Sequence, residues 1–272
     1  MAKVAIVTHP VRDEARQLAE EVSGWLAGQG HGTVLVQDPA DVDGADLAVS
    51  VGGDGTILRT VEMVSASGVP ILGVNSGRLG YLTAVEPSGL VPALERWLAG
   101  DYRIEERMTL AVTIDAPQSG MPRGPRIALN EAVVEKTSTG HTVHVAVCFD
   151  GVRFTTYAAD GLIVATPTGS TAYAFSVRGP ILAPSLRAML LTPVSPHMLF
   201  DRSLVLDADV TVRLEVMDER EATLTVDGQE LGRLHRGDGI ECAAGPHPAR
   251  FVTFRDRDFF RILKTKFGLA DR

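Results

Sequence analysis

The sequence has few cysteines, no long apolar run and no excess of basic residues. Cys148 and Cys242 are far apart and lie outside any CxxC motif or Cys/His cluster, which argues against a disulfide framework and a structural zinc site and indicates a reducing compartment. No apolar run approaches the ~20 residues that span a bilayer, and the apolar N-terminal stretch is too short for a signal peptide. We therefore expect a cytoplasmic protein with no membrane partner.

The balance of charge is acidic. The chain has 26 Lys and Arg against 34 Asp and Glu, a formal net charge of -8. Nucleic acid is therefore not an expected partner, because its binding depends mainly on clustered basic residues that release counterions. A small anionic ligand stays open, since backbone N–H groups can hold one. The length of 272 residues predicts about two domains, and 45% hydrophobic residues suffice for their cores.

Segments typical of strands and helices alternate along the first hundred residues. Apolar residues at helical spacing predict helices at 13–28, 57–64 and 90–98. Short apolar runs between them predict strands at 4–7, 33–36, 46–51 and 71–74. Because these strands are apolar on both faces, we expect a parallel sheet in an α/β domain over residues 1–103.

From about residue 102 the pattern changes to period-two alternation, which is typical of half-buried strands. Asp150-Gly151 and Asp227-Gly228 each lie between such runs and predict hairpin turns. Residues 104–244 are therefore expected to form a β-rich domain of mainly antiparallel strands, with an exposed loop at 118–125. In the tail, 245–272, the basic amphipathic segment 259–269 predicts a helix that packs back on the first domain.

A glycine-rich turn, Gly52-Gly53-Asp54-Gly55-Thr56, falls between a predicted strand and a predicted helix. Glycines there allow positive φ and close approach of a ligand, and the N-terminus of the helix can hold phosphate. Asp54 could then act as a base toward a substrate hydroxyl; the alternative is that it only caps the helix. The turn is neither a Walker A loop nor a GxGxxG fingerprint.

A second polar cluster, from Thr166 to Tyr173, follows the predicted strand at 161–165. Five hydroxyl side chains occur in these eight residues, with a proline and a glycine that favour a turn. Such an array can bind ribose or phosphate oxygens. The alternative is a connection whose hydroxyls bond to the local backbone and cap the next helix.

These two motifs, together with Asn130-Glu131 and Asp160-Gly161, resemble the NAD kinase family in order and separation. The GGDG motif alone also occurs in diacylglycerol-type lipid kinases and, as a variant, in 6-phosphofructokinases. The run DGLIVATPTGSTAY makes the resemblance to NAD kinases specific. It implies a phosphofructokinase-like α/β domain with a parallel sheet, a β-sandwich-like second domain, an active site in the cleft between them, and a homodimer or homotetramer.

The resemblance also implies roles for individual residues. Asp54 matches the catalytic aspartate that acts at the 2′-hydroxyl of the adenosine ribose of NAD, beside Gly55 and Arg59. Asn130 and Glu131 match an NAD-contacting pair, and Asp160 an aspartate that reaches NAD. The remaining positions that match ligand-contacting residues of the family are Tyr81, His141, Ala158, Thr171, Ala172, Tyr173, Ser176 and Gln229.

Two of these positions differ within the family. Tyr81 stands where many members have phenylalanine, and it keeps an aromatic face. Ala158 stands where some members carry a bulky basic residue associated with rejection of the reduced dinucleotide, so a small residue leaves NADH open as a substrate. His141 and Asn130-Glu131 also have plain interpretations, as a solvated loop histidine and a strand-end turn.

The expected reaction is phosphoryl transfer from ATP, or from polyphosphate, to the 2′-hydroxyl of NAD to give NADP. Mg²⁺ or another divalent cation is expected to arrive with ATP, since no carboxylate cluster in the sequence resembles a metal cage formed by protein alone. Two alternatives remain: a lipid or sugar kinase that shares the GGDG turn, and a nucleotide sensor that binds NAD without making NADP.

Overall fold

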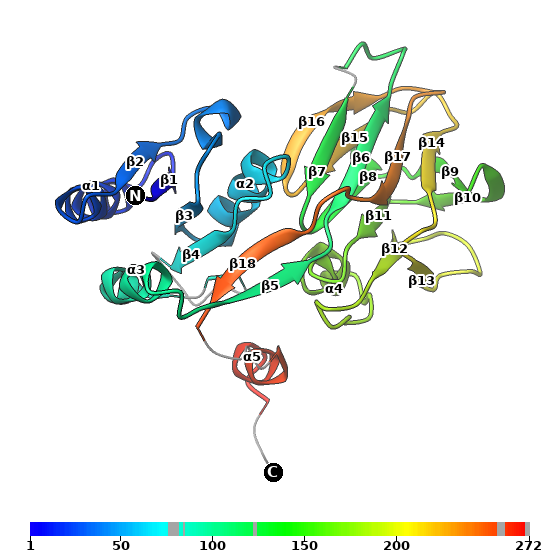
Figure 1. Cartoon of the computed structure of the whole chain (residues 1–272). Helices are drawn as coiled ribbons and strands as arrows, with labels where there is room; N and C mark the ends of the chain where they lie inside the picture. The colour runs from blue at the N-terminus through cyan, green and yellow to red at the C-terminus, as the bar shows by residue number, and fades with distance from the viewer. Residues whose placement is uncertain (76–81, 84, 122–123, 255–258, 270–272) are drawn as a thin grey trace. The chain divides into compact units, whose positions relative to one another are not determined.

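The computed structural model describes residues 1–75, 82–83, 85–121, 124–254 and 259–269 (Figure 1). It divides into two compact units, Met1–Arg107 with Pro248–Arg272, and Met108–His247. The domain limits expected from the sequence lie between residues 103 and 104 and between residues 244 and 245. Within the described residues, no helix is both long and apolar enough to cross a membrane.

The first unit is built on a six-stranded sheet in the order β2-β1-β3-β4-β18-β5. Neighbours from β2 to β18 pair in parallel, and β5 pairs antiparallel with β18. Its strands are β1 (Lys3–Thr8), β2 (Gly32–Leu35), β3 (Leu47–Gly52), β4 (Ile71–Asn75), β5 (Arg103–Arg107) and β18 (Ala249–Thr253). Its helices are α1 (Asp13–Gly28), α2 (Asp54–Val64), α3 (Leu90–Leu98) and α5 (Phe259–Lys266), with short 3₁₀ turns η1 (Pro39–Val42) and η2 (Pro87–Gly89).

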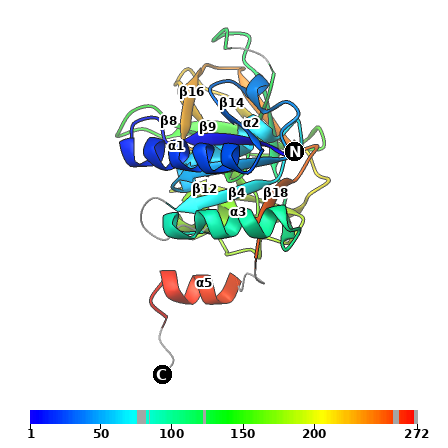
Figure 2. The same cartoon turned by 60° about the vertical axis from the view of Figure 1, so that its left-hand side comes forward.

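Helices cover both faces of this sheet. Helices α1 and α3 lie together on one face and α2 on the other (Figures 1 and 2). One face of α1 is buried at Ala15, Ala19, Val22 and Leu26, which share an apolar cluster with α3 and with β1, β3 and β4. Because β3 and β4 are buried along their whole length, their continuous apolar runs are explained by a sheet covered on both sides.

The second unit contains two six-stranded antiparallel sheets, in the orders β10-β9-β14-β17-β6-β7 and β13-β12-β11-β8-β15-β16. Inward side chains of both sheets, among them Val145 and Leu214 of one and Val164 and Leu224 of the other, form one apolar cluster, so the unit is a β-sandwich. The first sheet comprises β6 (Leu110–Asp115), β7 (Pro125–Ala128), β9 (Val143–Phe149), β10 (Val152–Ala159), β14 (Val212–Val216) and β17 (Gly239–Ala244). The second comprises β8 (Glu131–Lys136), β11 (Gly161–Ala165), β12 (Ala188–Val194), β13 (Leu204–Asp207), β15 (Ala222–Val226) and β16 (Gln229–Leu234), with η3 (Gly169–Thr171) and α4 (Tyr173–Ser176) after β11.

The two Asp-Gly pairs form tight hairpin turns, as predicted. Asp150 and Gly151 connect β9 to β10 with φ values of 49° and 78°. Asp227 and Gly228 connect β15 to β16 with φ values of 48° and 78°. Two successive residues at positive φ are the mark of a type I′ turn, whose twist matches that of paired strands.

Candidate functional site

The glycine-rich turn lies at the carboxyl end of β3, where the chain enters α2. A Cβ added at Gly52 would meet Thr56 Oγ1 at 2.1 Å, whereas Gly53 and Gly55 face open space within 4 Å. None of the three has a φ in the left-handed region, so the expectation of positive φ was wrong. Glycine is needed at position 52 because a Cβ there would overlap the Thr56 side chain. The open space at Gly53 and Gly55 leaves room for a ligand beside the backbone.

Asp54 is the first residue of α2, and Gly53 is the N-cap residue. Asp54 therefore does not occupy the N-cap position, and no side-chain hydrogen bond caps this end of α2. The carboxylate is half-exposed, and its Oδ1 accepts a hydrogen bond of 3.2 Å from the Leu82 backbone N–H. A carboxylate in the first turn is also favoured by the helix dipole, so Asp54 is held in place and remains accessible.

A lysine from the C-terminal helix lies near Asp54, which the sequence did not indicate. Lys266 Nζ of α5 is 4.0 Å from Asp54 Oδ2. Partial burial lowers the pKa of Lys266, and the charge of Asp54 opposes that shift. The amphipathic pattern predicted helix α5 but could not pair it with Asp54, more than two hundred positions earlier in the chain.

The other two candidates of the first unit differ in what can be said of them. Arg59 is half-exposed on α2 and follows Gly55 by four residues, which places both on one face of the helix. Tyr81 lies outside the described residues.

Glu131, at the start of β8, is a buried carboxyl with 7% of its surface exposed. Burial, helped by the negative charge of Asp227, raises its pKa from 4.5 to about 8, and a bond from the Tyr173 backbone N–H works in the opposite direction. Its Oε2 has no hydrogen-bond partner. Glu131 and Tyr173 are thus brought together, and one buried oxygen remains available for a ligand.

Most hydroxyls between Thr166 and Tyr173 bond inside the protein. Thr166 Oγ1 donates to the Leu129 carbonyl at 2.5 Å, and Ser170 Oγ donates to the Pro167 carbonyl at 2.6 Å. Thr171 Oγ1 donates to the Thr168 carbonyl at 3.1 Å. Thr166, Thr168 and Ser170 are also buried. The hydroxyls of Thr166 and Ser170 are therefore used by the backbone, as the alternative interpretation had it, whereas Thr168 Oγ1 has no hydrogen-bond partner among the described residues.

Asp160 and Tyr173 belong to a charged cluster at the opposite end of β8 from Glu131. Lys136 Nζ lies 2.6 Å from Asp160 Oδ1, and the Tyr173 hydroxyl donates to Glu135 Oε2 at 3.3 Å. Burial, together with the charges of Glu135 and Asp160, raises the pKa of Tyr173. Tyr173 therefore contacts Glu131 through its backbone and Glu135 through its ring.

The remaining candidates of the second unit occupy separate positions. His141 is exposed in the connection between β8 and β9, and Ala158 is half-buried on β10, opposite His144. Ser176 is exposed at the end of α4, and half-buried Thr171 and Ala172 precede that helix. Gln229 is exposed at the start of β16, next to the Asp227-Gly228 turn.

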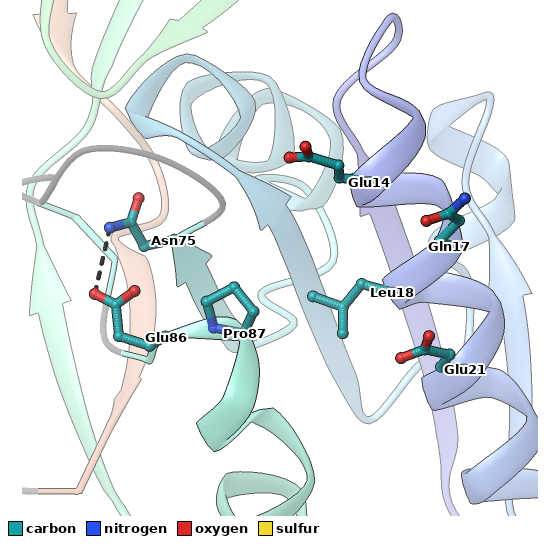
Figure 3. A pocket seen from close by; sticks show the side chains of 7 residues that line it. All are labelled: Glu14, Gln17, Leu18, Glu21, Asn75, Glu86 and Pro87. Atoms are coloured by element: carbon teal, nitrogen blue, oxygen red, sulfur yellow. Dashed lines mark hydrogen bonds between the residues drawn. The ribbon is translucent and has the colours of Figure 1, made fainter.

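A pocket of about 460 Å³ in the first unit lies between α1 and the region where β4 ends (Figure 3). Its lining includes three glutamates, and Asn75 Nδ2 donates to Glu86 Oε1 at 3.4 Å. The lining residues are Glu14, Gln17, Leu18, Glu21, Asn75, Glu86 and Pro87. None of the residues expected from the sequence to bind a ligand lines this pocket.

The α/β unit carries an accessible acidic residue in a glycine turn, and the β-sandwich carries the Asn130-Glu131 pair; an acid at a helix N-terminus suits phosphoryl transfer to a hydroxyl group. Residues 33–102 match the ATP-NAD kinase N-terminal domain, and residues 129–254 match the ATP-NAD kinase C-terminal domain. The chain belongs to the NAD kinase family.

Full-length relatives and solved structures agree with this assignment. The chain is 40% identical over 280 residues to the NAD kinase of Heliobacterium modesticaldum, covering 98% of both chains, and 43% identical over 293 residues to that of Geobacter metallireducens, covering 100% of both. It resembles an NAD kinase from Archaeoglobus fulgidus in complex with ATP, with a TM-score of 0.77, 28% identity and coverage of 99% and 100%. The fold also matches yeast NADH kinase complexed with NADH, with a TM-score of 0.88, 24% identity and coverage of 100% and 89%.

Proposed function

We propose that this protein transfers a phosphoryl group from ATP to the 2′-hydroxyl of the adenosine ribose of NAD and so makes NADP. Membership of the NAD kinase family supports the reaction, and the solved relative with ATP supports the donor. The observation that supports a catalytic role is the position of the Asp54 carboxylate. It is an accessible carboxylate at the start of α2, between two glycines that face open space.

Asp54 is suited to the acceptor side of this reaction. Its carboxylate can accept or orient the proton of the ribose hydroxyl while that oxygen attacks phosphorus. In phosphoryl transfer the negative charge is spread over the oxygens of the transferred group. The enzyme therefore contributes mainly by positioning the reactants and by neutralising that charge. The N–H groups at the start of α2 and the nearby Lys266 can supply part of that neutralisation.

Magnesium fits this arrangement as an ion that enters with ATP. The described residues contain no group of three His, Cys, Asp or Glu side chains placed to hold a metal, and Mg²⁺ is commonly held by one or two carboxylates together with substrate phosphates. Asp54 is the oxygen donor that this chain would offer. When bound, the ion would offset charge on the phosphates.

The second unit supplies most of the proposed NAD-contacting set, and the first unit adds Gly55, Arg59 and Tyr81. Asn130, Glu131 and Tyr173 form its centre, because Glu131 has an unpaired buried oxygen and contacts Tyr173. The other members of the set are Gly55, Arg59, Tyr81, His141, Ala158, Asp160, Thr171, Ala172, Ser176 and Gln229. Ala158 is a small residue at its half-buried position on β10, so NADH is a second proposed acceptor. A homodimer or homotetramer is proposed from the family resemblance. A cytoplasmic location is proposed because both cysteines are free, which suits a reducing compartment.

The deciding experiment measures NADP formation by purified protein with NAD and Mg·ATP. Asp54→Asn should remain folded and bind NAD but lose most of its turnover, by roughly a hundredfold or more. Asp13→Asn is the matched control, because Asp13 is likewise the first residue of a helix; it should retain full activity. An Asp54→Asn enzyme with wild-type kcat would remove Asp54 from its catalytic role.

The same assay separates the alternatives. In parallel reactions, diacylglycerol or NADH replaces NAD as the acceptor, and polyphosphate replaces ATP as the donor. A lipid kinase would phosphorylate diacylglycerol and leave NAD unchanged, and a nucleotide sensor would bind NAD and form no NADP. Wild-type protein that makes neither NADP from NAD nor NADPH from NADH, with either donor, would refute the proposed function.

A further inference from the structure

The turn between β15 and β16 makes contacts that a hairpin does not need. We propose that Asp227 is a positioning residue that fixes the backbone of residues 129–131 and so presents the Asn130 and Glu131 side chains to NAD. The functional part of this inference depends on the proposed function, whereas the backbone contacts can be tested without it.

Asp227 holds the N–H side of this segment. Its Oδ2 accepts a bond of 2.7 Å from the Leu129 N–H, and its Oδ1 accepts bonds of 2.8 Å and 3.1 Å from Asn130 and Glu131. The Asp227 N–H in turn donates to the Glu131 carbonyl at 3.0 Å. Bonds from N–H groups to an ionised carboxylate are stronger than those to a neutral acceptor, so one side chain fixes three successive residues.

The turn after β11 holds the carbonyl side. Thr166 Oγ1 donates to the Leu129 carbonyl at 2.5 Å, and the Thr166 N–H donates to the Asn130 carbonyl at 2.8 Å. A Cβ at Gly169 would lie 2.1 Å from the Asn130 carbonyl oxygen, so only glycine permits this close approach. All N–H and C=O groups of residues 129–131 therefore have partners from Asp227 or Thr166.

The two side chains of the pair are left for other contacts. Asn130 is half-exposed, and Glu131 keeps an unpaired buried oxygen. A buried polar atom without a partner lowers the stability of the fold. Here that atom, Glu131 Oε2, is held in a fixed position by a backbone whose hydrogen bonds are all made. This arrangement suits recognition of a ligand by a preformed site, which avoids the cost of ordering the chain on binding.

The other Asp-Gly hairpin shows that the turn itself does not require these bonds. Asp150 has nearly the same φ as Asp227, and the two following glycines share a φ of 78°. Its Oδ1 accepts a bond from one backbone N–H, that of Thr211, at 2.9 Å. The three bonds at Asp227 are therefore additional to hairpin formation, and Asp150 provides a matched control.

The test compares Asp227→Asn with Asp150→Asn in the full-length protein. Asn-Gly also forms type I′ turns, so both variants should fold. In Asp227→Asn we expect the amides of residues 129–131 to exchange with deuterium about tenfold faster or more, and KM for NAD to rise about tenfold. We expect KM for ATP and kcat to change less than threefold, and Asp150→Asn to leave all four quantities unchanged.

A second pair of variants covers the case in which Asp227→Asn does not fold. Thr166→Val removes the hydroxyl that bonds to Leu129 and should also raise KM for NAD, whereas Thr166→Ser keeps it and should not. Unchanged exchange at 129–131, or an equal rise of KM for NAD in Asp150→Asn, would overturn the inference. If wild-type protein makes no NADP, the proposed function fails by itself, and the exchange rates still decide whether Asp227 fixes the segment.

Discussion

Glu131 is a carboxyl that the folded protein holds largely protonated at neutral pH, because its pKa is raised from 4.5 to about 8. In the unfolded chain the same group ionises near its ordinary value. Between about pH 4.5 and pH 8 the folded state therefore binds one more proton than the unfolded state. The contribution of Glu131 to the free energy of unfolding must then fall as pH rises through this window and level off above it.

Replacement of Glu131 by glutamine tests that sign. Glutamine keeps the shape of the protonated carboxyl and does not titrate, so the stability of Glu131→Gln relative to wild type should increase between pH 5 and pH 8. The slope should reach at most about 1.4 kcal/mol per pH unit. Urea unfolding at several pH values measures it, with exposed Glu95→Gln as a control for net charge. A constant difference across the window would show that Glu131 is ionised in the folded protein.

Single residues also mark the limit of what the sequence could predict. The sequence identified Asn130-Glu131, Asp160 and Tyr173 as candidates by their order and separation, and the structure places Glu131 in contact with Tyr173. The orientation of the hydroxyls was not readable, because Thr166 and Ser170 bond to carbonyls that belong to Leu129 and Pro167. The Thr166 bond depends on which strands become neighbours, which composition does not encode. The Ser170 bond is local, but composition does not show which acceptor within the turn the hydroxyl takes.

The strand–turn–helix element formed by β3 and α2 uses its glycines for two different purposes. Gly52 is pressed against Thr56, whereas Gly53 faces open space at negative φ. The motif alone could not distinguish them, since both were expected to serve conformation and ligand approach. The predicted helix also began at Ile57, three residues after its start in the structure, because the apolar pattern begins only there.

Alanine substitutions separate those purposes. Gly52→Ala should destabilise the first unit by about 1–3 kcal/mol, because the new Cβ overlaps Thr56. Gly53→Ala should leave stability nearly unchanged and weaken substrate binding, because the methyl group occupies the open space. Tryptophan fluorescence during urea unfolding and KM values measure the two effects. Equal loss of stability in both variants would contradict the distinction.

Most elements with a strong local period were predicted at or near their observed limits. Helices 13–28 and 90–98 and the strand at 161–165 agree with the structure residue for residue. Strand β18 was missed, because Ala249–Thr253 has little alternation and is recognisable only by its pairing with β4 and β5. Local pattern thus defined the elements, while long-range pairing decided the composition of the sheet.

At the scale of the whole molecule, the first unit is made from two distant parts of the chain. Strand β18 lies between β4 and β5, and both of its neighbours precede it by more than 140 residues. If the chain ends after His247, those two strands lose their shared partner and expose unpaired backbone groups. A chain that ends after Phe254 keeps the complete sheet.

These two truncations should therefore behave differently. Residues 1–247 should fail to form the first unit, whereas residues 1–254 should unfold cooperatively. Trp25 and Trp97 are the two tryptophans of the chain, and both belong to this unit, so their fluorescence monitors it alone. Native fluorescence and a cooperative transition in 1–247 would show that β18 is dispensable.

The position of β18 also constrains the order of events during synthesis. Residues 108–247 form a continuous unit and can fold as soon as they leave the ribosome. The parallel sheet has to wait for residues 249–253, although most of its strands are translated first. The earlier half of the polypeptide must therefore remain incomplete, with β4 and β5 open to wrong partners, until the later half has been made.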